Sequence, residues 1–215
     1  MENMPMPRVM SDMLILPDGD VIIINGARSG TAGWESAINP VTRPLIYNPN
    51  GKAGARFSVM AASSRPRLYH STAVLLTDGR VLVGGSNPHK YYNFTGVDFP
   101  TDLSLESFSP HIYRPLQRFL KTSAVSVRIV APSFNTHSFS MNQRMVVLKG
   151  AGVSRVGSNV YRVAASGPSN PEIAPPGYYC CFSFMLVFRV LDCGLRFSNM
   201  LAYKVDDALL PFTIN

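Results

Sequence analysis

Two adjacent residues, Tyr69 and His70, carry the side chains in this sequence with the clearest chemical potential. A phenolate oxygen and an imidazole nitrogen both suit Cu(II) in a tetragonal site of nitrogen and oxygen donors. Three more histidines, His89, His111 and His137, could supply a second imidazole from a distant part of the chain. A Tyr-His pair with one distant histidine is therefore a candidate copper-binding set.

The alternative for the same pair is a structural role, with a buried tyrosine and a hydrogen-bonded histidine at the start of a strand. Adjacent side chains of a regular strand point to opposite faces, so Tyr69 and His70 can bind one ion only if the backbone is irregular there. Pro66, just before the pair, disfavours regular strand pairing. A metal role therefore predicts an irregular entry into the following strand.

The residues after the pair predict a β-hairpin. Apolar runs at Ser71–Leu76 and Arg80–Gly84 flank Thr77-Asp78-Gly79. An Asp-Gly turn between such runs indicates a hairpin because glycine accepts a positive φ. The stretch at residues 13–26 repeats the pattern around Asp18-Gly19.

The two hairpins lie 60 residues apart, measured between Asp18 and Asp78. Repeated hairpins that end at glycine indicate blades of a kelch-type β-propeller, whose period is about 50 residues. The longer spacing predicts an insertion, for which residues 34–44 are the expected place. The Gly, Ser and Thr residues of 26–33 predict a loop.

Further short strands are expected at Leu45–Asn48 and Phe57–Ala61, and residues 91–110 predict a loop with one weak edge strand. Beyond about residue 112 the Asp-Gly hairpins disappear. Alternating residues at 125–129, with further strands at 145–148 and 159–164, predict a β-sandwich.

Composition restricts the class of protein. The chain has 215 residues, 46% of them hydrophobic, which is enough for a globular core. The net charge of +7 favours anionic partners, but the basic residues are scattered, so nucleic acid is not an expected partner.

The apolar run at 178–190 is too short for a membrane helix, which needs about 20 residues. The first residues show no signal peptide, and Asn93-Phe94-Thr95 is a glycosylation sequon.

Five segments resemble the plant glyoxal oxidase (aldehyde oxidase) branch of the galactose-oxidase-like copper radical oxidases. They are Met4–Met13, Ile24–Glu35, Arg65–Pro88, Ala131–Arg144 and Pro171–Tyr179. The resemblance implies an all-β chain that starts with the last blades of a kelch propeller at residues 1–112. A truncated immunoglobulin-like β-sandwich at residues 113–179 follows, and residues 180–215 form an atypical tail.

The resemblance also implies a site. Tyr69 corresponds to the axial copper ligand and is the candidate catalytic proton acceptor, while His70 and His137 correspond to the two equatorial ligands. His89 and His111 match no ligand position and are expected to have surface or capping roles. The implied reaction oxidises a small aldehyde or alcohol with O₂ and yields hydrogen peroxide, with aldehydes giving carboxylic acids. An extracellular or cell-wall location is implied as well.

One part of the implied cofactor has no counterpart in this sequence. In the family, a second tyrosine, cross-linked to a cysteine in an earlier blade, carries a radical. The first cysteine here is Cys180, followed by Cys181 and Cys193. We therefore expect no oxidase turnover from these 215 residues alone. The alternative function is a non-catalytic kelch-type module that binds a protein or an anionic cell-wall polysaccharide.

Overall fold

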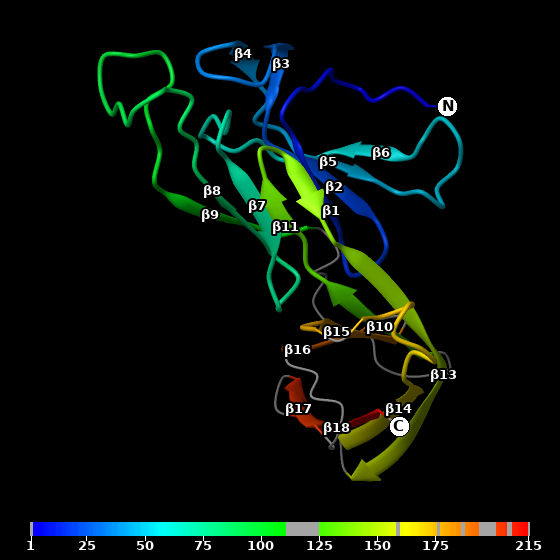
Figure 1. Cartoon of the computed structure of the whole chain (residues 1–215). Helices are drawn as coiled ribbons and strands as arrows, with labels where there is room; N and C mark the ends of the chain where they lie inside the picture. The colour runs from blue at the N-terminus through cyan, green and yellow to red at the C-terminus, as the bar shows by residue number, and fades with distance from the viewer. Residues whose placement is uncertain are drawn as a thin grey trace. The chain divides into compact units, whose positions relative to one another are not determined.

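The structure, a computed structural model, is built from β-strands throughout the part of the chain that it describes (Figure 1). The described residues are 2–110, 125–157, 160–175, 177–185, 188–193, 201–205 and 208–214. Within them, none forms a helix that is long and apolar enough to cross a membrane. The expected all-β class is confirmed.

The chain divides into two compact units. Unit 1 comprises residues 1–76, 80–110 and 133–143, and unit 2 comprises residues 77–79, 111–132 and 144–215. The three domain ranges expected from the sequence stay predictions.

Unit 1 begins with a four-stranded antiparallel sheet, the arrangement of one propeller blade. Its order is β1-β2-β5-β6, from β1 (Asp12–Ile15), β2 (Val21–Ile24), β5 (Leu45–Tyr47) and β6 (Phe57–Val59). The predicted hairpin around Asp18-Gly19 and the two short strands after it are confirmed.

A second hairpin is inserted between β2 and β5. Here β3 (Ala27–Gly30) pairs with β4 (Ala37–Pro40), so the expectation of a loop over residues 26–33 is wrong. The physical reason is burial, because Ala27 and Ala37 pack with Leu68 in a small core and buried backbone groups must find partners. The predicted insertion, placed at residues 34–44, overlaps the β4 side of this hairpin.

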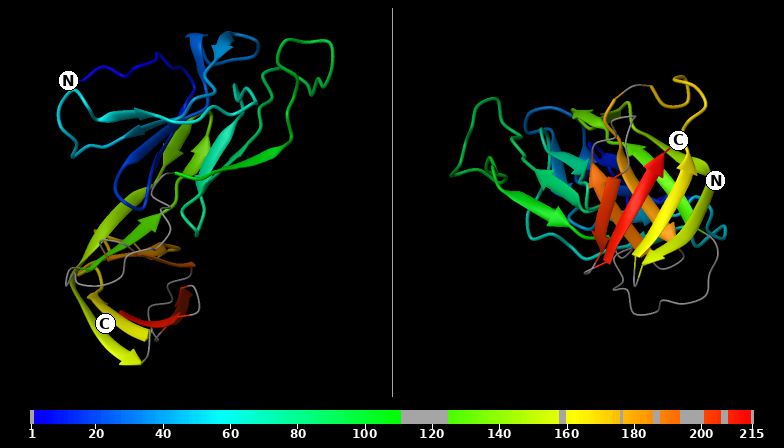
Figure 2. Two further views of the ribbon diagram at one scale, coloured as in Figure 1. Left: turned by 180° about the vertical axis from the view of Figure 1, so that it is seen from behind. Right: turned by 90° about the horizontal axis from the view of Figure 1, so that it is seen from below.

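The second sheet of unit 1 has the order β7-β8-β9. Strands β7 (Thr72–Leu75) and β8 (Val81–Gly84) form the predicted hairpin, and β9 (Leu105–Phe108) is the predicted edge strand. Figure 1 and Figure 2 show this sheet beside the first one, with β7 next to β1. Both β1 and β7 are the terminal strands of their sheets.

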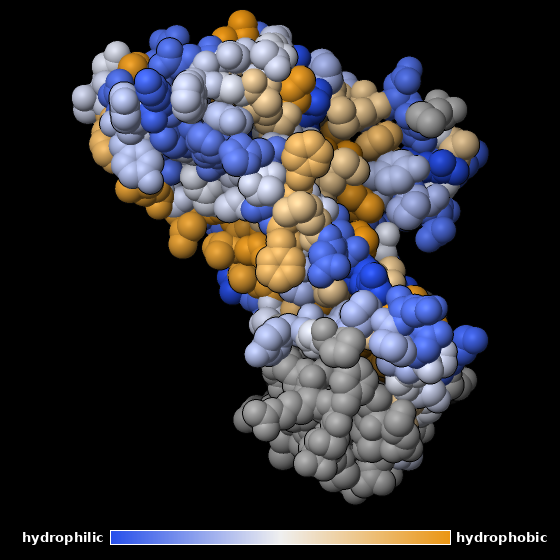
Figure 3. Space-filling model, in the orientation of Figure 1, coloured by the Kyte–Doolittle hydropathy of each residue, from blue (hydrophilic) through white to orange (hydrophobic). Residues whose placement is uncertain are grey.

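The two repeated hairpins bury opposite faces. Strand β1 buries Asp12 and Leu14, whereas β7 buries Ala73 and Leu75, which occupy the alternate positions of the repeat. Side chains alternate between the faces of a strand, so two neighbouring blades that pack together must bury opposite sets. The outward faces keep apolar side chains such as Leu105, which is 68% exposed, and Figure 3 shows apolar residues at the surface over β9.

Asp12 is an ionisable group inside this packed interface. Its side chain has no exposed surface, and the Asn25 amide Nδ2 donates a 2.7 Å hydrogen bond to Oδ2. Burial raises the pKa of Asp12 to about 6, against the opposing effect of the Asn25 hydrogen bond. The folded chain therefore holds this proton more tightly than the unfolded chain does.

The Asp12→Asn variant is expected to be more stable than the parent protein above pH 6 and to lose most of that advantage near pH 4. A raised carboxyl pKa contributes stability at low pH that is lost as the pH rises from the unfolded value through about 6. The difference in free energy of unfolding between Asp12→Asn and the parent is expected to change with pH by up to about 3 kcal/mol. Urea unfolding of both proteins at pH 4 and pH 7.5 measures it, and a constant difference would contradict the buried-carboxyl interpretation.

Unit 2 is organised around a seven-stranded sheet with the order β16-β15-β10-β13-β14-β18-β17. The strands are β10 (Val125–Ala131), β13 (Arg144–Gly157), β14 (Val160–Ser166), β15 (Cys180–Met185), β16 (Phe188–Cys193), β17 (Leu201–Val205) and β18 (Ala208–Ile214). The long β13 pairs with β10 through its first residues and with β14 through its later ones. It therefore connects the two halves of an immunoglobulin-like fold, and the strands predicted at 125–129, 145–148 and 159–164 are confirmed.

Tyr179 is a further immunoglobulin-like feature of unit 2. Its ring is 4% exposed and its hydroxyl donates a 2.9 Å hydrogen bond to the carbonyl oxygen of Pro175, just before β15 begins. A buried tyrosine that binds the backbone a few residues upstream fixes a strand corner in such sandwiches.

Candidate metal centre

Tyr69 and His70 lie in a turn that leads into β7. His70 has a φ of 60°, and the Ser71 N–H donates a 3.1 Å hydrogen bond to the Leu68 carbonyl oxygen. This left-handed residue breaks the alternation of a regular strand. The irregular backbone that a shared ion would require is confirmed at this place.

His137 lies at the tip of a hairpin that belongs to unit 1. Strands β11 (Phe134–Thr136) and β12 (Phe139–Met141) pair on either side of His137 and Ser138. Both tip residues have positive φ values, 47° and 69°, as a two-residue type I′ turn requires. The hairpin enters between the blades, with β11 next to β7 and β12 next to β1.

The three predicted ligand residues converge. The ring centres lie 4.0 Å apart for Tyr69 and His70, 5.7 Å for Tyr69 and His137, and 5.2 Å for His70 and His137. Because an imidazole nitrogen lies about 2 Å from a bound transition metal, two imidazoles can share one ion when their centres are within roughly 6 Å. Both histidines are exposed and Tyr69 is half-buried, so the group is open to solvent.

Each histidine has one ring nitrogen engaged by a neighbour. His70 Nδ1 lies 3.0 Å from the Asn87 carbonyl oxygen, which can only accept, so Nδ1 carries the proton. His137 Nδ1 lies 2.7 Å from the Thr136 hydroxyl oxygen. Hydrogen bonding at Nδ1 leaves Nε2 of each ring available as a metal donor, as in many protein metal sites.

The donor set of one phenol oxygen and two imidazole nitrogens fits Cu(II). In the part of the chain that the structure describes, no three side chains of His, Cys, Asp or Glu form a metal cluster. Any metal site at these rings therefore depends on the tyrosine.

Arg67 is a buried residue that supports the turn carrying Tyr69 and His70. Its side chain is 3% exposed and donates hydrogen bonds to the carbonyl oxygens of Gly85 and Ser104 and to Glu106 Oε2, the last at 2.8 Å. Gly85 in turn contacts the His70 backbone, since a Cβ atom on this glycine would lie 2.5 Å from the His70 carbonyl oxygen. Arg67 and Gly85 thus hold the backbone of the Tyr-His pair in place.

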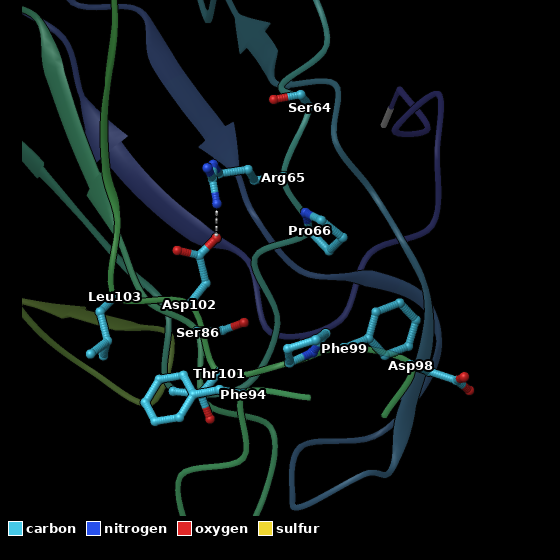
Figure 4. Close-up of a pocket in the computed structure, with 11 residues that line it drawn as sticks. Ser64, Arg65, Pro66, Ser86, Phe94, Asp98, Phe99, Thr101, Asp102 and Leu103 are labelled. Atoms are coloured by element: carbon cyan, nitrogen blue, oxygen red, sulfur yellow. Dashed lines mark hydrogen bonds and ion pairs between the residues drawn. The ribbon is translucent and has the colours of Figure 1, made fainter. Parts of the chain in front are cut away.

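An open cavity of about 630 Å³ lies beside this support, and the three rings are not among its lining residues (Figure 4). Within it Arg65 Nη1 pairs with Asp102 Oδ2 at 2.9 Å. Burial would raise the pKa of Asp102, but hydrogen bonds from Ser104 and Arg65 and the nearby Arg67 charge lower it to about 2. Both arginines of this segment form ion pairs, Arg65 with Asp102 and Arg67 with Glu106.

Of the surface or capping roles expected for His89, the surface role is wrong. His89 is 7% exposed, with Nδ1 2.8 Å from Glu35 Oε1 and Nε2 2.8 Å from the Phe99 carbonyl oxygen. Two acceptors favour the doubly protonated ring, and the Glu35 hydrogen bond raises the pKa of His89. Sequence patterns missed this role because Glu35 comes from the inserted hairpin. His111 lies outside the described residues.

Comparisons with known proteins agree with this architecture. The family described as "Glyoxal oxidase N-terminus" matches residues 1–112, and "Galactose oxidase-like, Early set domain" matches residues 105–186. Aldehyde oxidase GLOX1 of Arabidopsis thaliana is 41% identical, over 85% of this chain and 34% of its own length. Aldehyde oxidase GLOX of Vitis pseudoreticulata is also 41% identical, over 86% of this chain and 40% of its own length.

More distant relatives share the fold. Galactose oxidase of Gibberella zeae is 27% identical over 81% of this chain. The solved structure of a fungal alcohol oxidase of the AA5 family, described in complex with copper, superposes with a TM-score of 0.64 at 20% identity, covering 84% of this chain and 40% of that one. This chain thus spans about a third to two fifths of the length of the plant relatives. The match over residues 1–112 shows that the chain belongs to the glyoxal oxidase family, within the galactose oxidase-like copper radical oxidases.

Proposed function

We propose that this chain forms the copper-binding end of an extracellular aldehyde oxidase, with Tyr69, His70 and His137 as protein ligands. The observation that carries the proposal is the convergence of these rings, each centre within 5.7 Å of the others, from segments that are distant in sequence. In the reaction proposed for the whole enzyme, a small aldehyde, water and O₂ give a carboxylic acid and hydrogen peroxide. Alcohols are alternative substrates.

Bound copper would supply the one-electron redox chemistry that side chains lack. The residues of the chain would hold and orient it. The Asn87 carbonyl oxygen fixes the ring of His70, and the Thr136 hydroxyl engages the ring of His137. The phenol oxygen of Tyr69 is the proposed acceptor of the substrate proton, as the family resemblance implies.

These 215 residues lack a cysteine that could form the family's cross-linked tyrosine radical. The sequence has no cysteine before Cys180, and Cys180 lies in β15 of unit 2. We therefore propose that the 215 residues bind copper without oxidase turnover.

The chain is expected to bind one Cu(II) ion, and His70→Ala and His137→Ala are each expected to weaken binding at least about 100-fold, because each removes one of only three protein donors. Competition titration against a chelator of known affinity measures this. Electron paramagnetic resonance should show two coupled nitrogen nuclei in the parent protein and one in each variant. His111→Ala, which removes a histidine with no proposed ligand role, is the matched control and should bind as the parent does.

Peroxide release separates copper binding from catalysis. The copper-loaded chain is expected to give no hydrogen peroxide from methylglyoxal above the rate of free Cu(II). Peroxide production that His70→Ala abolishes would refute the proposed inactivity. Absence of copper binding, together with equal binding of an anionic polysaccharide by the parent and the histidine variants, would favour the non-catalytic module instead.

A further inference from the structure

We infer that two side-chain amides, Gln143 and Asn135, are positioning residues that hold the His137 hairpin between the two blades of unit 1. Neither residue is one of the proposed ligands. The inference extends the proposed function, since it explains how His137 is kept near Tyr69 and His70. Its geometric part can be tested without any metal.

Gln143 binds the free edge of the first blade. The Ile15 N–H donates a 3.0 Å hydrogen bond to Gln143 Oε1, and Gln143 Nε2 donates one of 2.9 Å to the Met13 carbonyl oxygen. Strand β1 is the terminal strand of its sheet, so these two backbone groups have no strand partner on that side. The Gln143 amide takes the place that a peptide group of a neighbouring strand would occupy.

Asn135 binds the free edge of the second blade. Its Nδ2 donates a hydrogen bond to the carbonyl oxygen of Ala73 in β7, which is also the terminal strand of its sheet. Asn135 lies two residues before His137, and Gln143 lies six residues after it. Each side of the hairpin tip is therefore attached to a different blade.

The hairpin has little else to fix its position. Strands β11 and β12 have three residues each and pair only with each other, and an isolated two-stranded hairpin is marginally stable in water. Its large apolar side chains, Phe134, Phe139 and Met141, are 68%, 69% and 49% exposed, so they contribute little burial. In the described part of the chain, the hydrogen bonds of the two amides are thus the main specific contacts between this hairpin and the blades.

The expected consequence of losing one amide is a displaced His137 ring. The ring is currently 5.2 Å from His70 and 5.7 Å from Tyr69, centre to centre, and a movement of about 1 Å would spoil a shared ligand geometry. Residues that orient metal ligands typically change metal affinity about 10- to 100-fold when they are replaced.

The test replaces each amide by an apolar side chain of similar size. Gln143→Leu and Asn135→Leu are each expected to weaken Cu(II) binding about 10- to 100-fold and to alter the electron paramagnetic resonance spectrum. The hydrogen bonds of the Gln143 and Asn135 amides together form a clamp on the two blades. Met141→Leu is the matched control, because Met141 lies on the same hairpin, is exposed, and takes no part in the clamp. Its copper affinity and spectrum should equal those of the parent. Parental copper affinity and spectrum in Gln143→Leu and in Asn135→Leu would overturn the inference.

A second readout needs no metal. Nuclear Overhauser contacts between the ring protons of Tyr69 and His137 should be present in the metal-free parent and in Met141→Leu. They should be absent in Gln143→Leu and Asn135→Leu. If the parent binds no copper, the proposed function fails. The ring contacts still show whether the clamp holds the His137 hairpin in place. Ring contacts that persist in Gln143→Leu and in Asn135→Leu would overturn the inference.

A milder variant covers the case in which a leucine variant does not fold. Gln143→Glu keeps an acceptor for the Ile15 N–H but removes the donor to the Met13 carbonyl oxygen and places a negative charge beside it. It should lose the Tyr69–His137 ring contacts while its circular dichroism spectrum stays that of the parent. Unchanged ring contacts in this variant would contradict a positioning role for Gln143.

Discussion

Replacing Arg67 by methionine is expected to lower the free energy of unfolding by about 3–5 kcal/mol, since the change removes an ion pair whose arginine is buried and leaves two carbonyl oxygens without their donor. The guanidinium is 3% exposed and bonds Glu106 and the carbonyl oxygens of Gly85 and Ser104. Methionine fills much of the volume but donates no hydrogen bond. Urea unfolding at pH 7 measures the loss.

Arg65→Met is the matched control, two residues away on the same segment. Arg65 is 51% exposed and pairs with Asp102 at 2.9 Å, and an exposed pair of this kind contributes about 1 kcal/mol or less. Equal losses in the two variants would show that the buried contacts of Arg67 add nothing. Copper affinity is expected to fall only in Arg67→Met, because Arg67 holds Gly85 against the His70 backbone.

Gly85→Ala is expected to destabilise the chain by about 2–4 kcal/mol and to weaken copper binding together with it. Gly85 has a φ of 80°, which an alanine adopts at a cost of about 1–2 kcal/mol. Its new Cβ would lie 2.5 Å from the His70 carbonyl oxygen, so the Tyr-His turn has to move. Thermal unfolding and chelator competition measure the two effects.

Gly54→Ala isolates the backbone contribution of that change. Gly54 has a φ of 86°, but a Cβ at this position meets no atom within 4 Å. The control should therefore lose only the backbone cost of about 1–2 kcal/mol, with unchanged copper affinity. If Gly85→Ala lost no more stability than Gly54→Ala and bound copper as the parent does, the contact between Gly85 and His70 would have no importance for the site.

Local patterns predicted the blades because a hairpin leaves its signature in adjacent residues. The Asp-Gly turns at residues 18–19 and 78–79 define both hairpins, and the strands lie where the apolar runs place them. The irregular backbone at Tyr69 and His70 also followed from local reasoning, because the alternation of a strand cannot direct adjacent side chains at one ion. The family resemblance, and not spacing, selected His137.

Other features could not be predicted because they depend on which parts of the chain meet. The pairing of β3 with β4 depends on a small core around Ala27, Ala37 and Leu68. The clamp joins Gln143 to residues 128 and 130 positions earlier in the chain. A local sequence pattern does not identify partners that are so distant in the chain. The hairpin repeat likewise does not predict that β1 and β7 bury opposite faces.

The separation between Gln143 and β1 also bears on how the protein folds. Contacts between residues that are distant in sequence require a large loss of chain entropy before they contribute any stabilising free energy, so they form late. The blades can close their own hairpins locally, whereas the segment that carries His137 has to find an edge laid down 128 residues before it. Ring convergence is therefore a late product of folding, and a nascent chain that has not yet exposed residue 143 from the ribosome has not brought Tyr69, His70 and His137 together.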